Sequence, residues 1–67
     1  MSDAFNMSMR KFLKQVGVTS QQEIEKSLRD AREAGTLSGG AVRAKVVLTI
    51  EETGLTHTVE GEIKLDD

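Results

Sequence analysis

The side chains that could carry acid–base or metal chemistry in this sequence are one histidine and a group of carboxylates. His57 is the only histidine, and no serine or aspartate stands at a recognisable motif spacing from it. The chain has no cysteine, which excludes disulfides and thiolate metal sites. The carboxylates of the second half follow no calcium-loop spacing: Glu51, Glu52, Glu60, Glu62, Asp66 and Asp67. We therefore expect no enzymatic activity, no metal and no cofactor, and a structural or solvent-exposed role for these residues.

The size of the chain limits the core that could position such residues. Its 67 residues suffice for one small domain, residues 1–67, and only 3% of them are aromatic. Domains of this size often gain stability from disulfides, a metal or a partner subunit. Because the first two are excluded here, we expect association with a protein partner, and we favour a homodimer.

The distribution of charge and hydropathy indicates whether the chain could bind nucleic acids or span a membrane. Residues 1–35 carry six Lys/Arg and five Asp/Glu, whereas residues 36–67 carry three and six, so their net charges are +1 and −3. An acidic half repels phosphate, so nucleic acid is not the favoured partner. No segment approaches the roughly 20 apolar residues of a membrane span, and the first residues lack the pattern of a signal peptide. We expect a cytoplasmic protein that does not bind membranes.

Two helices are predicted in the first half of the chain. Apolar residues recur at helical spacing from Phe5 to Val16, which predicts a helix over residues 3–15, capped by Ser2 or Asp3 and ended by Gly17. A second helix is predicted over residues 20–34. Two capping boxes overlap at its start, and Gly35 follows its end.

The second half predicts a β-hairpin. Apolar and polar residues alternate over residues 42–50 and again over residues 56–65. Apolar positions are even on the first strand and odd on the second, so facing residues must sum to an odd number. A two-residue or a four-residue loop satisfies this condition, and we favour four residues because Thr53 suits the two-residue turn poorly. Gly61 interrupts the apolar face, which indicates close packing or a bulge.

The junction between the two predicted helices resembles the turn of a helix-turn-helix DNA-binding motif, with the hairpin as its wing. That resemblance assigns DNA contacts to residues at the start of the second helix: Thr19, Ser20, Gln21, Gln22, Lys26 and Arg29. The chain departs from the motif by one missing helix and by Glu23 at a position that is usually buried. An ordinary helical hairpin is the alternative, and we favour it.

The block from Asp3 to Gln21 resembles the opening of a family of short bacterial proteins of unknown function. The segments Glu23–Lys26 and Val59–Ile63 are similar to the same family. The resemblance implies a bacterial cytosolic protein and carries no functional residue across.

Together these patterns predict an α+β fold of order ααββ, in which a two-helix hairpin packs on one face of a two-stranded antiparallel β-hairpin. The function that we expect is protein interaction or self-association, and the alternative is DNA binding.

Overall fold

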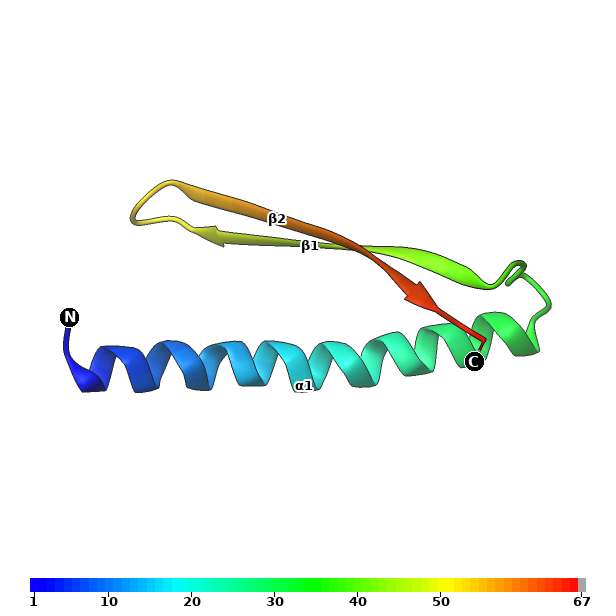
Figure 1. The fold of residues 1–67 in the computed structure, drawn as a ribbon, viewed down its shortest axis with the longest axis horizontal. Coiled ribbons are helices and arrows are strands. Elements are labelled where there is room, and N and C mark those ends of the chain that lie inside the picture. Colours follow the sequence, from blue (N-terminus) through cyan, green and yellow to red (C-terminus); the bar gives the residue numbers. More distant parts are fainter. Residues whose placement is uncertain (67) are drawn as a thin grey trace. The chain divides into compact units, whose positions relative to one another are not determined.

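The computed structural model describes residues 1–66, so Asp67, one of the carboxylates considered above, lies outside the described residues. The element order is helix α1 (Asp3–Glu33), strand β1 (Ala41–Ile50) and strand β2 (Leu55–Lys64) (Figure 1). The chain divides into two compact units, one built on α1 and one on the hairpin, and each is described by itself. The predictions of a single domain and of helices packed on a sheet face therefore stay predictions.

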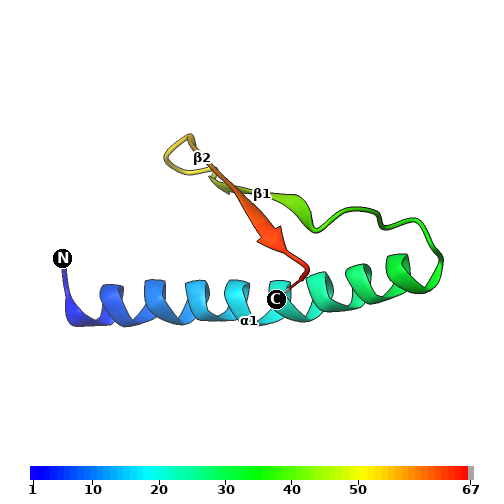
Figure 2. The ribbon, with the colours of Figure 1, turned by 45° about the vertical axis from the view of Figure 1, so that its right-hand side comes forward.

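The α+β class is confirmed, but the two-helix hairpin is wrong because the first half forms one helix of 31 residues. The predicted boundaries at residues 15 and 20 do not exist, and α1 runs through this segment without a break (Figure 2). Gly17 has no positive φ, unlike the glycines that end elements elsewhere in the chain. The hydroxyl of Thr19 donates to the carbonyl oxygen of Gln15 at 2.8 Å instead of capping a new helix.

A simple cost comparison explains why α1 continues through Gly17. A glycine inside a helix costs about 1 kcal/mol relative to alanine. A break would instead create two new helix ends, each with up to about four unpaired backbone groups. Those groups would need caps or water, and the reversed helices would need a shared core. Continuation is the cheaper choice for an isolated stretch of helix.

Both ends of α1 are set by local signals that the sequence contains. At the N-terminus, the Ser2 hydroxyl accepts a hydrogen bond from the Phe5 amide at 3.2 Å, so Ser2 and not Asp3 is the cap. At the C-terminus, Gly35 adopts a φ of +74°. The amide of Gly35 donates to the Arg32 carbonyl, and the amide of Thr36 donates to the Ala31 carbonyl. This pair of bonds is the Schellman arrangement, and it confirms Gly35 as the helix end.

The hairpin forms nearly as predicted: β1 begins one residue earlier, and β2 is displaced by one residue toward the N-terminus. Ala41 faces Lys64, Ile50 faces Leu55, and the ladder between them is unbroken. The loop therefore has four residues, Glu51 to Gly54, which confirms the favoured loop length. Gly54 adopts the positive φ of +72° that this turn requires.

The register separates the hairpin into two faces. One face carries the apolar pairs, with Val42 against Ile63 and Val46 against Val59. Gly61 lies on this face opposite Ala44 in an unbroken ladder, so it marks no bulge, and a Cβ placed there would meet nothing within 4 Å. No side chain among residues 1–66 is buried, so neither unit has an interior of its own.

Candidate functional site

The six residues proposed to contact DNA do not lie at the start of a helix. They lie in the middle of α1, so the helix-turn-helix prediction is wrong because no turn precedes them. The 3.6-residue period places Thr19, Gln22, Lys26 and Arg29 on one face and turns Ser20 and Gln21 away from it.

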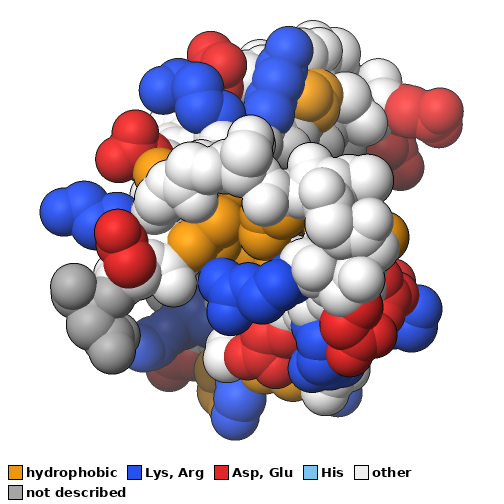
Figure 3. Space-filling model, turned by 90° about the vertical axis from the view of Figure 1, so that its right-hand side faces the viewer, with side chains coloured by type: hydrophobic (Ala, Val, Ile, Leu, Met, Phe, Trp, Pro, Cys, Tyr) orange, Lys and Arg blue, Asp and Glu red, His pale blue; other side chains and the backbone are white. Residues whose placement is uncertain are grey.

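Three of these six side chains bond to neighbouring residues of the helix, among them Thr19 through its hydrogen bond to the Gln15 carbonyl oxygen. The Gln21 amide donates to Glu25 Oε1 at 3.1 Å, and Lys26 Nζ lies 3.1 Å from an Asp30 carboxylate oxygen. Basic and acidic side chains are also interspersed on the surface shown in Figure 3. A phosphate backbone would therefore meet a mixed field and not a basic one.

The continuous helix joins two apolar patterns that seemed separate in the sequence. We call the result the helix stripe. Its members recur every three or four residues, with Ser20 in the one gap between them: Phe5, Met9, Phe12, Val16, Ile24, Leu28 and Ala31. The phase is kept across Gly17, so all seven side chains lie along one side of α1.

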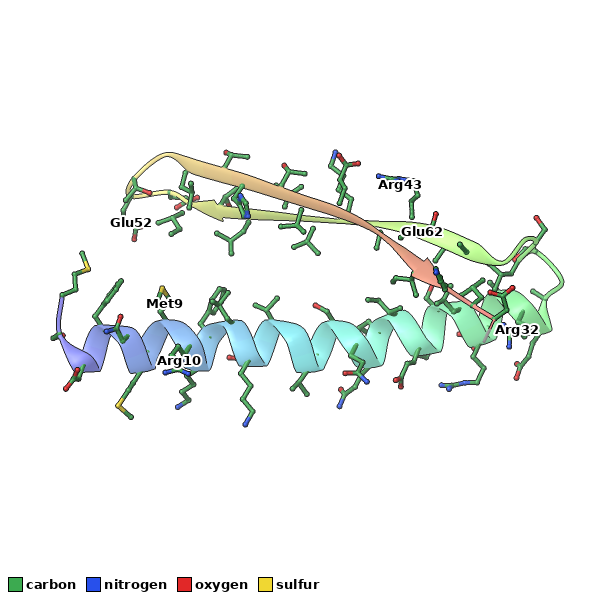
Figure 4. The ribbon with its side chains drawn as sticks, viewed as in Figure 1. Met9, Arg10, Arg32, Arg43, Glu52 and Glu62 are labelled. Atoms are coloured by element: carbon green, nitrogen blue, oxygen red, sulfur yellow. The ribbon has the colours of Figure 1, made fainter. Side chains whose placement is uncertain are left out.

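The helix stripe exposes large apolar side chains. Phe5 and Met9 are each 43% exposed, and Phe12 is 54% exposed. The neighbouring Met9 and Arg10 project from opposite sides of the ribbon, which displays the amphipathic character of the helix (Figure 4). The prediction from sequence divided the helix stripe between two helices. The unbroken spacing from Val16 through Ser20 to Ile24 was the signal for a single helix.

The other face of the hairpin carries a ladder of opposite charges. Arg43 faces Glu62 and Lys45 faces Glu60, and a diagonal pair joins Arg43 to Glu60 at 4.0 Å. Figure 4 labels Arg43 on β1 and Glu62 on β2. Two basic residues of β1 thus face two acidic residues of β2, which favours the observed register over a slipped one.

The residues that could have carried acid–base or metal chemistry do not come together in the structure. His57 lies on the apolar face opposite Leu48, close to the loop. Within residues 1–66, no three side chains of the metal-ligating types come close enough together to hold an ion. In that same part of the chain, no helix combines the length and the hydropathy that a membrane span requires.

The fold and its surfaces define a small α+β protein that consists of one amphipathic helix and one β-hairpin. The family of unknown function DUF6494 matches residues 1–66, and the chain belongs to this family. This match confirms the resemblance to a family without an assigned activity. No curated protein and no solved structure shows significant similarity to the chain.

Proposed function

We propose that the chain is a non-enzymatic protein-interaction domain and that the helix stripe is its binding surface. The observation that carries this proposal is the continuity of the helix stripe over nearly the whole of α1, with its largest side chains about half exposed. Apolar surface gains roughly 25 cal/mol for each Å² removed from water, so a partner that covers the stripe is strongly favoured.

The dimensions of the helix stripe suit a protein partner. Thirty-one residues at about 1.5 Å each give a helix about 46 Å long. A contact strip of this length and about 10 Å wide covers on the order of 500 Å² on each side. The two sides together reach roughly 1,000 Å², the lower limit for specific protein–protein interfaces.

Photo-crosslinking in the cells that express the protein tests this proposal. A photoreactive phenylalanine analogue at Phe12 lies on the helix stripe, and the same analogue at Val18 lies on another side of the helix. The two native side chains are similarly exposed, at 54% and 47%, so the second site is a matched control. We expect protein adducts from Phe12 and few from Val18. Equal adduct yields, or no protein adduct at Phe12, would refute the proposal.

A further inference from the structure

The distribution of side-chain size and charge along α1 identifies a partner for the helix stripe. We propose that the stripe pairs with the stripe of a second copy of this chain, with the two helices antiparallel. This inference rests on the proposed function, because it requires the helix stripe to be a binding surface.

Side-chain size changes along the helix stripe. Both aromatic members, Phe5 and Phe12, lie in the first half of α1. The second half contains the smallest member, Ala31, and two small residues that lie on the same side of the helix without belonging to the stripe, Ser20 and Ser27. A parallel pair would set Phe against Phe at one end and Ala against Ala at the other. Such a pair could not keep one interhelical distance along its whole length.

An antiparallel pair matches a large side chain with a small one at most facing positions. If the two-fold axis passes near residue 18, facing positions sum to 36. Phe5 then faces Ala31 of the other copy, and Val16 faces Ser20. Phe12 faces Ile24, and this pair of two large side chains occurs twice, once on each side of the two-fold axis. Alternation of large and small residues across facing positions is what dense packing requires.

Charge also favours the antiparallel arrangement. Residues 3–17 of α1 hold Arg10, Lys11 and Lys14 against Asp3, a net charge of +2. Residues 18–33 hold three basic and four acidic side chains, a net charge of −1. Antiparallel pairing places the basic half of one copy beside the acidic half of the other. It also sets the positive end of each helix dipole beside a negative end.

A dimer could also form by pairing of the open hairpin edges, but the charges on the strands favour this arrangement less. A two-fold pairing of two β1 edges about Ala44 would set Arg43 against Lys45 of the other copy. A pairing of two β2 edges about Gly61 would set Glu60 against Glu62. Like charges directly opposite each other destabilise a sheet. The charge ladder therefore disfavours these two symmetric pairings.

Sedimentation equilibrium on the full chain tests association, and two methionine variants test its location. Met9→Gln changes the helix stripe, whereas Met7→Gln makes the same change two residues away at a side chain that is 72% exposed. We expect a concentration-dependent dimer whose dissociation constant rises at least about tenfold in Met9→Gln. We expect no change in Met7→Gln. A chain that stays monomeric, or equal effects of the two variants, would overturn the inference.

Spin-label distances test the orientation of the two helices. The chain has no cysteine, so Ser8→Cys or Gln15→Cys gives one label on each copy. The two sites lie on the same side of the helix stripe, so their labels are displaced sideways from the helix axis by the same amount. In the antiparallel pair, the two Ser8 labels lie about 30 Å apart along the axis, and the two Gln15 labels about 9 Å apart. Equal distances at both sites would indicate a parallel dimer and overturn the inference.

The two proposals fail in different ways. Crosslinks from Phe12 to a different protein, together with a chain that is monomeric when purified, would overturn the homodimer and leave the interaction domain standing. The absence of any protein adduct at Phe12 would remove the basis for both.

Discussion

Replacement of Gly17 by alanine distinguishes one continuous helix from two helices by the sign of its effect. If Gly17 ended a helix in a left-handed conformation, an added Cβ would cost roughly 1–2 kcal/mol. In α1 the glycine is inside the helix with no positive φ. Alanine is then about 1 kcal/mol more favourable than glycine. The two interpretations predict changes of opposite sign.

No steric contact within the chain reduces the stabilisation expected from Gly17→Ala. A Cβ built at Gly17 meets no atom within 4 Å, so the substitution introduces no clash within the chain. We therefore expect Gly17→Ala to raise the free energy of unfolding by about 1 kcal/mol. For a chain of this size, that gain raises the melting temperature by about 4–8 °C.

Gly35→Ala is the matched control. Gly35 also has open space around its Cβ position, but its φ of +74° strains any other residue. We expect the same substitution there to lower stability by roughly 1–2 kcal/mol. The two variants thus differ in backbone conformation and not in crowding.

Thermal melts followed by far-ultraviolet circular dichroism measure both variants. The melts are repeated over a range of protein concentrations, which separates helix stability from association. Carbon chemical shifts of residues 15–20 report directly whether the helix is continuous. A loss of stability in Gly17→Ala similar to that in Gly35→Ala would refute the single helix.

Three further predictions concern the ends of the helix and the hairpin. Ser2→Ala removes the N-terminal cap and is expected to cost about 1 kcal/mol, seen as faster amide exchange in the first turn. Arg43→Glu is expected to weaken the hairpin, and adding Glu62→Arg should restore it. A double-mutant cycle should give a coupling of about 0.2–1 kcal/mol that disappears in high salt. Gly61→Ala is expected to stabilise the hairpin by about 0.5–1 kcal/mol in urea unfolding, because open space surrounds the new methyl group. A loss of stability in that variant would mean that the site is packed after all.

The hairpin was predictable from the sequence because its determinants are local. Alternation with a period of two assigns each residue to a face, and the parity of the two strands restricts the loop length. Gly54 supplies the positive φ that the four-residue loop needs. The prediction erred by one residue at the strand ends, where the pairing of Ala41 and Leu55 depends on the partner strand as much as on residue type.

The helix stripe was also present in the sequence, as was its phase across Gly17. Its interpretation as two helices rested on a glycine followed by two residues that often cap helices, Thr19 and Ser20. The DNA-binding hypothesis depended on the same break, so it lost its structural basis when the helix proved continuous.

The sequence by itself determined the helical and extended halves, the helix end at Gly35 and the faces of the two strands, because short-range geometry decides each of them. Only the tertiary structure decided whether the chain reverses at Gly17. The local preference there is worth only about 1 kcal/mol, whereas a reversal requires a core between two helices. Such a core is a property of contacts between distant residues, which no local pattern contains.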